Sequence, residues 1–219
     1  MTDSPTRVAV LISGEGSNLQ ALIDTERAGE LGAKIVAVIS NRSTARGLER
    51  ARTAGIDTHH VPSRGAERSA YSAALAAALA PYAPDLLVLA GFMRILSPEF
   101  VASFAGRMLN IHPSLLPAYT GLETHRRVLE AGERWHGATV HFVTTELDAG
   151  PSVLQYRLRV RAGDTADSLA ARVHIGEHII LPRAVQWFAQ GRLRLARGSV
   201  MLDGRPLPTP ELIDEQEVS

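Results

Sequence analysis

An amide and an imidazole stand two positions apart in this sequence, as Asn110 and His112, and their chemistry makes them the first candidates for a functional site. The apolar residues before them are typical of the end of a buried strand, where residues two apart point to the same face. Pro113 cannot donate to a sheet, so the strand should give way to a loop there. A pair held in this way can polarise a carbonyl group and move a proton.

A carboxylate that could serve this pair lies in the turn at residues 147–151, after the strand that carries His141. Glycine and proline fix such turns and would hold Asp148 in place. Near His112, an ionised Asp148 would orient the imidazole and stabilise a positive charge on it. Taken alone, an aspartate in a turn is more often only a turn former.

A glycine-rich turn, SGEGSN at residues 13–18, joins an apolar strand to a helical pattern. Glycines allow close approach of a ligand, and the start of a helix favours an anion. The dinucleotide fingerprint would need a glycine in place of Leu19 and an acid in the segment 40–42, which reads Ser-Asn-Arg. A single phosphate is therefore favoured over NAD. The alternative is a tight turn in which Ser17 caps the helix.

Two further segments have both a functional and a structural interpretation. The loop at 91–96 is apolar with one arginine and suits a flat heterocycle, although alone it reads better as a loop tucked into the core. Residues 174–178 match the H-x-x-E-H metalloprotease pattern, which we reject because Gly176 weakens the helix and only a Pro-rich tail could supply a third ligand. Glu177 can still reach a substrate. The other histidines form no ligand spacing and are expected on the surface or hydrogen-bonded in the core: His59, His60, His125, His136 and His141.

Composition excludes several classes of function. The net charge is zero, which gives no footprint for nucleic acid or a membrane surface. Without cysteine there is no disulfide, thiolate metal site or cysteine nucleophile, and Lys34 is the only lysine, which removes Schiff-base chemistry. No apolar stretch approaches the roughly 20 residues of a membrane helix. Residues 1–6 lack the apolar core of a signal peptide, so a cytoplasmic protein is expected.

Strands alternate with helices over the first 110 residues, which predicts a doubly wound α/β fold with a mostly parallel sheet. Ligands of such sheets bind beyond the carboxyl ends of the strands, so the loops after Gly14, Gly91 and Asn110 should meet at one crevice. A long helical pattern follows at 165–190, which Pro182 should kink or divide. The tail from residue 203 is Pro-rich and acidic, and we expect it to be extended and poorly packed.

Taken together, these segments resemble the phosphoribosylglycinamide formyltransferase family, also called GAR transformylase. The resemblance is collinear and spans nearly the whole chain. It rests on the stretches VLISGEGSNLQALID, NRSTARGLERARTAGI, APDLLVLAGFMRILSPEF, GRMLNIHPSLLPAYTGLETH, HGATVHFVTTELDAGP and ARVHIGEHIILP.

The resemblance implies formyl transfer from 10-formyltetrahydrofolate to the glycinamide amine of a phosphoribosyl substrate, with no metal. The implied catalytic residues are Asn110, His112 and Asp148. The implied substrate-binding residues are Gly16, Ser17, Asn18 and Glu177. The implied folate-binding residues are Arg68, Met93, Arg94, Ile95, Leu96 and Asn110, with a loose alignment around Arg68. Thr120 and Glu123 depart from the proline and histidine that are frequent in the family.

The same resemblance implies a Rossmann-like formyltransferase fold with an added C-terminal hairpin and a long helix. One domain would span residues 1–202, with a phosphate-binding half at 1–110, a catalytic and folate half at 111–202, and an extended tail at 203–219. The partners would be small molecules only, and the chain would be a monomer or a homodimer.

Alternatives remain within and outside the family. A 10-formyltetrahydrofolate hydrolase shares the fold and the three catalytic residues, but its family usually adds an N-terminal regulatory domain, whereas the first strand begins here at Arg7. Methionyl-tRNA formyltransferase adds an RNA-binding domain for which the residues after Gln190 are too few and not basic enough. Another amine, such as that of a sugar, could accept the formyl group. A non-enzymatic nucleotide-binding module would explain the loop at 13–18 but not the catalytic residues.

Overall fold

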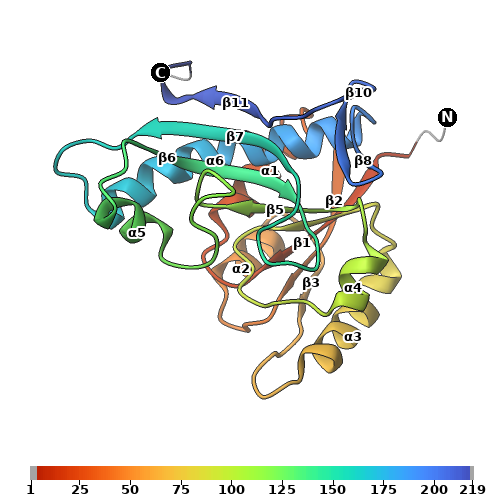
Figure 1. Cartoon of the computed structure of the whole chain (residues 1–219). Helices are drawn as coiled ribbons and strands as arrows, with labels where there is room; N and C mark the ends of the chain where they lie inside the picture. The colour runs from red at the N-terminus through yellow and green to blue at the C-terminus, as the bar shows by residue number, and fades with distance from the viewer. Residues whose placement is uncertain (1–3, 218–219) are drawn as a thin grey trace.

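A computed structural model describes residues 4–217 of the chain. Its centre is an eight-stranded sheet with the order β11-β7-β6-β5-β4-β1-β2-β3, and a three-stranded sheet, β10-β9-β8, stands beside it (Figure 1). In the large sheet only β6 runs antiparallel to its neighbours, β5 and β7. The predicted doubly wound, mostly parallel sheet is therefore confirmed, and so are the long helix and an added C-terminal antiparallel hairpin.

The strands and helices have the following bounds. The strands of the large sheet are β1 (Thr6–Ile12), β2 (Ala33–Ser40), β3 (Thr58–His60), β4 (Leu86–Leu89), β5 (Met108–His112), β6 (Trp135–Phe142), β7 (Ser152–Arg159) and β11 (Glu211–Asp214). The small sheet consists of β8 (Leu193–Ala196), β9 (Ser199–Leu202) and β10 (Arg205–Pro206). The helices are α1 (Ser17–Arg27), α2 (Arg46–Thr53), α3 (Arg68–Leu79), α4 (Pro98–Ser103), α5 (Thr124–Glu130) and α6 (Ala166–Ala189), with 3-10 turns η1 (Ala80–Tyr82) and η2 (Glu215–Glu217).

Strand β1 shows why the sheet is covered on both faces. Its residues from Val8 to Ile12 are apolar without alternation and fully buried, as a strand covered on both sides requires. Val8 and Val10 belong to the core under α1, α2 and α6, whereas Ala9 and Leu11 belong to a second core under α3 and α4. Two apolar layers thus hold β1 at the centre of the sheet and fix the loop that follows it.

Helix α6 is continuous from Ala166 to Ala189, so the expectation that Pro182 would divide it is wrong. A proline inside a helix removes one backbone hydrogen bond. Here the residues around it, Leu181, Ala184 and Val185, are fully buried, and the helix packs against β6, β7 and α1. This burial stabilises the helix across the position where the local signal predicts a break.

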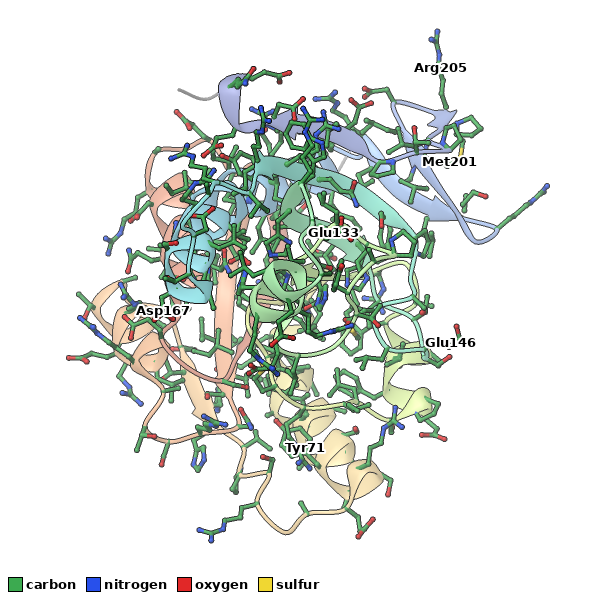
Figure 2. The ribbon with its side chains drawn as sticks, turned by 60° about the vertical axis from the view of Figure 1, so that its left-hand side comes forward. Tyr71, Glu133, Glu146, Asp167, Met201 and Arg205 are labelled. Atoms are coloured by element: carbon green, nitrogen blue, oxygen red, sulfur yellow. The ribbon has the colours of Figure 1, made fainter. Side chains whose placement is uncertain are left out.

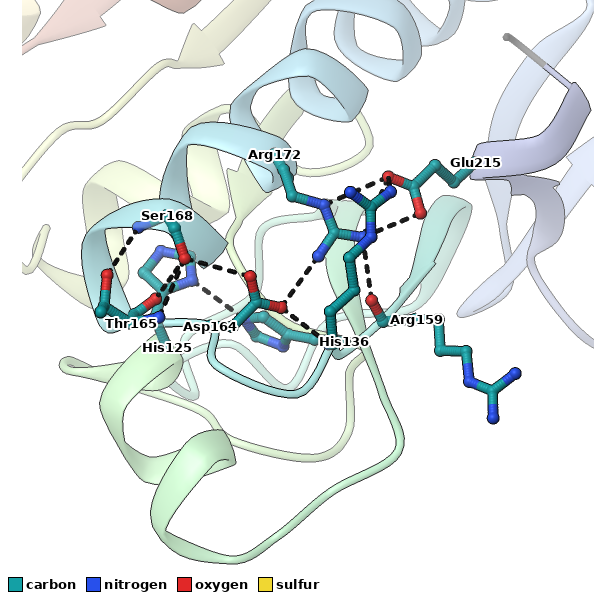
Figure 3. A network of polar contacts seen from close by, with 9 residues as sticks. His125, His136, Arg159, Asp164, Thr165, Ser168, Arg172 and Glu215 are labelled. Atoms are coloured by element: carbon teal, nitrogen blue, oxygen red, sulfur yellow. Dashed lines mark hydrogen bonds and ion pairs between the residues drawn. The ribbon is translucent and has the colours of Figure 1, made fainter.

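The C-terminal tail is extended, but the expectation of poor packing is wrong. Strand β11 adds a parallel edge strand beside β7, and Ile213 is 93% buried in the main core, with an exposed fraction of 7%. Asp214 accepts two hydrogen bonds from Arg157, at 2.8 and 2.9 Å. Figure 3 shows a further tie, in which Arg172 of α6 pairs with Asp164 and Glu215, each at 2.9 Å.

The small sheet and helix α3 mark opposite ends of the molecule. Figure 2 shows Met201 and Arg205 of the small sheet far from Tyr71 of α3, with the large sheet between them. In the described range 4–217, no helix is both long and apolar enough to cross a membrane.

Candidate active site

The loops that follow the central parallel strands are tied to one another, as their position at the carboxyl ends of the strands predicts. Ser13, directly after β1, donates its backbone N–H to Gly91 O at 3.2 Å, and its hydroxyl accepts from Met93 N at 2.7 Å. The same hydroxyl donates to Asn41 after β2, at 2.6 Å. One crevice edge is therefore built from the ends of β1, β2 and β4.

Asn110 lies in β5 opposite His141 of the antiparallel strand β6, and their side chains meet. Nδ2 of Asn110 is 3.0 Å from Nε2 of His141, whose Nδ1 is 3.0 Å from the carbonyl oxygen of Phe142. A carbonyl only accepts, so Nδ1 carries the proton and Nε2 accepts from the amide. Burial lowers the pKa of His141 to about 4, so this neutral tautomer persists at neutral pH and fixes which way the Asn110 amide points.

His112 is buried between two acceptors. Its Nδ1 lies 3.5 Å from Oδ2 of Asp148, and its Nε2 lies 2.9 Å from the carbonyl oxygen of Tyr119. Asp148 also accepts from Gly121 N at 2.8 Å. Both ring nitrogens of His112 thus face oxygen atoms that can only accept a hydrogen bond, and a doubly protonated imidazole would satisfy both.

The loops around His112 contain residues with uncommon backbone conformations. Tyr119, Glu123 and Asp148 all have positive φ, at 57°, 58° and 53°. Such angles are uncommon for residues other than glycine and persist where the surroundings enforce them. Glu123, one of the departures from the family pattern, is paired with Arg126 at 3.1 Å and its side chain is 64% exposed, so its charge is directed to solvent.

A cavity of about 300 Å³ adjoins these groups. Asn110, His141 and Asp148 line one side of it. Of the predicted folate-binding residues it is lined by Arg68, Arg94, Ile95, Leu96 and Asn110. Met93 lies outside the lining, with a side chain that is 57% exposed. The lining combines apolar side chains with two arginines and two acids, Glu146 and Asp148, and suits a flat, partly apolar ligand with polar groups.

The glycine-rich turn ends in Gly16, which precedes α1 with φ +74°. No side chain caps this helix, so the alternative in which Ser17 is the cap is wrong. A Cβ atom at Gly16 would lie 2.6 Å from Cα of Gly47, and Gly47 N donates to Gly14 O at 3.1 Å. The loop is packed directly on the start of α2, and the free N–H groups at the start of α1 are available to an anion.

Glu177 connects this loop to helix α6. It is 3% exposed and accepts from Asn18 Nδ2 at 2.7 Å, and its Oε2 lies 2.8 Å from Nδ1 of His174. Burial alone would raise the pKa of Glu177, but the hydrogen bonds from His174 and Asn18 outweigh it and the pKa is lowered. Asn18 Oδ1 is buried without a partner in the described structure. The site thus presents an ionised carboxylate and a free acceptor.

The structure brings some of the sequence-predicted residues into contact, Asn18 with Glu177 and His112 with Asp148, and gives others partners that the sequence did not reveal. His141 was expected only as a surface or core histidine, yet it orients Asn110 and lines the cavity. Its signal was the antiparallel register, which places it directly opposite Asn110. The metalloprotease-like motif does not form a cluster: in residues 4–217 no three His, Asp or Glu side chains converge as metal ligands would.

Comparison with known proteins places these features in context. A family model described as formyl transferase matches residues 6–185. The chain is 54% identical over 202 residues to the phosphoribosylglycinamide formyltransferase of Escherichia coli. The alignment covers 92% of this chain and 95% of that relative.

Solved structures give the same result. The phosphoribosylglycinamide formyltransferase of Coxiella burnetii superposes with a TM-score of 0.92 at 50% identity, over 96% of this chain and all of that one. A formyltetrahydrofolate deformylase of Pseudomonas syringae superposes with a TM-score of 0.85 at only 28% identity, and the match covers 66% of that chain. The sequence identity to the two transferases named above, 54% and 50%, is well above the 28% identity to the deformylase.

Proposed function

Because the chain belongs to the formyl transferase family, we propose that it transfers the formyl group of 10-formyltetrahydrofolate to the amine of 5-phosphoribosylglycinamide, with Asn110, His112 and Asp148 as its catalytic residues. Formyl transfer in purine biosynthesis is the function that its close relatives carry. The observation that supports the residue roles is that Asn110 and Asp148 line one cavity at the carboxyl ends of the strands and that Nδ1 of His112 lies 3.5 Å from Asp148.

In this proposal the substrate amine attacks the formyl carbon and negative charge develops on the formyl oxygen. An amide nitrogen has two N–H groups, and His141 accepts one of those of Asn110, so the other is free to donate to that oxygen. His112 supplies the second donor from Nε2, which in the unliganded chain is directed at the Tyr119 carbonyl. The Asn110 amide is thus oriented before substrate binds, whereas His112 must exchange the Tyr119 carbonyl for the oxyanion.

Asp148 stabilises the positive charge of a protonated His112 and holds the ring in this orientation. It accepts a hydrogen bond from Gly121 N, which keeps the carboxylate in place. The bond between the formyl carbon and N10 of the folate then breaks, tetrahydrofolate leaves, and its N10 takes up the proton that the amine loses, with Asp148 positioned to help a bound water relay it. No covalent intermediate is needed, because the amine attacks directly.

The substrate-binding roles follow from charge and hydrogen-bonding capacity. The loop at Gly16, Ser17 and Asn18 offers backbone donors to the phosphate, and Glu177 offers a carboxylate to the ribose or glycinamide part. The folate would occupy the 300 Å³ cavity, with Ile95 and Leu96 as its apolar wall. Residues 1–110 and 111–202 would then be the phosphate-binding and the catalytic and folate halves of one domain.

The experiment is an assay of the purified protein with 10-formyltetrahydrofolate, with and without 5-phosphoribosylglycinamide. We expect tetrahydrofolate and the formylated ribonucleotide to form together, and neither to form without the ribonucleotide. Deformylation of the folate at the same rate in both reactions would instead identify a hydrolase. Replacement of the ribonucleotide by an amino sugar tests whether another amine is the acceptor.

A further inference from the structure

A carboxylate stands inside the loop that is to bind the phosphate. Glu15 lies between Gly14 and Gly16, where its negative charge would repel a dianion. Two arginines of α2 neutralise it: Arg46 Nη1 is 3.1 Å and Arg50 Nη2 is 2.6 Å from Oε1 of Glu15. The three side chains together carry one net positive charge beside the loop.

The two arginines are held differently. Arg50 has a 25% exposed side chain and donates to the Glu15 carbonyl at 2.9 Å and to Gln20 at 3.3 Å, besides pairing with the carboxylate. It therefore ties the loop to α1 and α2. Arg46 has a 66% exposed side chain, and in the described residues the structure gives it one polar partner, the Glu15 carboxylate.

Arg46 is close to the loop and has space to move. It is the first residue of α2, and the next residue, Gly47, packs on Gly16. Its side chain is 66% exposed and borders a cavity of about 220 Å³ between α1 and α2, so its guanidinium is not enclosed by other groups. An exposed ion pair is worth only about 0–1 kcal/mol, so a dianion can compete with Glu15 for it.

We propose that Arg46 is a phosphate-binding residue of this chain, held beside the loop by Glu15 and transferred to the phosphate when the substrate binds. Arg50 stays on Glu15 and keeps the loop and the carboxylate in place. The phosphate then gains a guanidinium in addition to the backbone donors of the loop. This inference rests on the proposed function, because it assumes that the phosphate of the substrate lies on the Gly16 loop.

The test is Arg46→Ala in steady-state kinetics. We expect the KM for 5-phosphoribosylglycinamide to rise about 5–10-fold at low salt, because a dianion loses one nearby cation. The kcat and the KM for the folate should stay within about two-fold of the unmodified protein, and the rise in KM should shrink as salt is added. Glu15→Gln should lower the KM for the ribonucleotide about two- to five-fold, because it removes a like charge.

Arg52→Ala is the matched control, since it removes the same charge from an exposed position of the same helix, where Arg52 donates to Thr58. An equal rise in KM in this variant would overturn the proposal, as would an unchanged KM in Arg46→Ala. A weaker affinity in Glu15→Gln would also contradict it, because the carboxylate would then be required for loop structure.

Calorimetry separates this proposal from the proposed function. Ribose 5-phosphate and ribose are titrated into the unmodified chain and into Arg46→Ala. We expect Arg46→Ala to weaken the binding of ribose 5-phosphate about 5–10-fold and to leave that of ribose unchanged. If the unmodified chain does not formylate the ribonucleotide, the proposed function fails, and this titration still decides the role of Arg46. Equal affinities of the two proteins for ribose 5-phosphate would overturn it.

Discussion

The proposed phosphate loop at residues 13–18 and the proposed catalytic residues Asn110, His112 and Asp148 lie at the same end of one sheet, but they are built from different parts of the chain. The loop owes its shape to backbone contacts between glycines, since Gly16 has positive φ and packs on Gly47. The catalytic residues owe their positions to buried side chains, such as His112 and His141, and to loops in which Tyr119 and Asp148 have positive φ. A site built from backbone contacts should tolerate changed side chains but not an added Cβ atom at its glycines. A site built from side chains should instead be sensitive to changes of those side chains.

The largest effect is expected in the catalytic region, from Asp148→Asn. This change keeps the shape of the side chain but removes the charge that faces His112. We expect kcat to fall by about 10²–10³, comparable to the loss of one oxyanion donor, while the affinity for the ribonucleotide stays within a few fold. Single-turnover kinetics and calorimetry measure the two quantities. Near-normal turnover would contradict the role given to Asp148.

The corresponding change in the backbone-built region is Gly16→Ala. Positive φ and a contact of 2.6 Å between the new Cβ and Gly47 Cα should together lower the free energy of unfolding by about 2–4 kcal/mol. Urea denaturation measures it. Gly14→Ala is the matched control, because a Cβ there meets no atom within 4 Å, and we expect a change below about 1 kcal/mol. Equal losses in both variants would remove the distinction between the two regions.

The loss of folding stability in acid should also arise mainly from the catalytic region. Burial lowers the pKa of both His136 and His141 from 6.5 to about 4, so the unfolded chain takes up these protons first and stability falls as the pH drops from 6.5 toward 4. Between pH 6.5 and 5 each histidine should cost about 2 kcal/mol of unfolding free energy. The raised pKa of His174 acts in the opposite direction.

Urea denaturation at pH 7.5 and pH 5 tests this, with His136→Gln as the variant. We expect a smaller loss of stability on acidification in His136→Gln than in the unmodified chain. His60→Gln, an exposed position on β3 in the phosphate-binding half, should leave the loss unchanged. The same pH dependence in all three proteins would show that the buried histidines do not determine it.

The smallest effect concerns Glu177, which ties the glycine-rich loop to helix α6. Glu177→Gln removes the charge beside Asn18 and His174, and we expect the KM for the ribonucleotide to rise about 10-fold, which corresponds to about 1.4 kcal/mol. The kcat and the KM for the folate should change little, as for a group that contributes equally to ground-state and transition-state binding. An equal rise in the KM for the folate would indicate a general disturbance of the site.

Much of the fold and of the site could be predicted from sequence because the signals are local. The unbroken apolar run of β1 indicated a strand covered on both faces, and the spacing of Asn110 and His112 before Pro113 indicated two side chains on one face at a strand end. The roles of these residues came from the resemblance to a family, because residue types alone left a binding module open.

The remaining features depend on tertiary contacts. The Tyr119 carbonyl and the Gly121 N–H serve as partners through the backbone of a loop, which side-chain types do not encode. Strand β11 forms in a Pro-rich segment because β7 offers it an edge and the core accepts Ile213. Helix α6 continues through Pro182 for the same reason, since burial on both sides of the proline outweighs the lost hydrogen bond.

The contact between Asn18 and Glu177 has a consequence for synthesis of the protein. These two residues are 159 positions apart, so the first turn of α1 leaves the ribosome long before its carboxylate partner exists. The parallel strands can begin to pair before α6 is synthesised. At that stage the Asn18 amide lacks its hydrogen-bond partner Glu177. His112 and Asp148 are synthesised after Asn18 and before Glu177. If Glu177 binds the substrate as proposed, the site is complete only after α6 docks, and a chain that ends before α6 would lack the contact between Asn18 and Glu177.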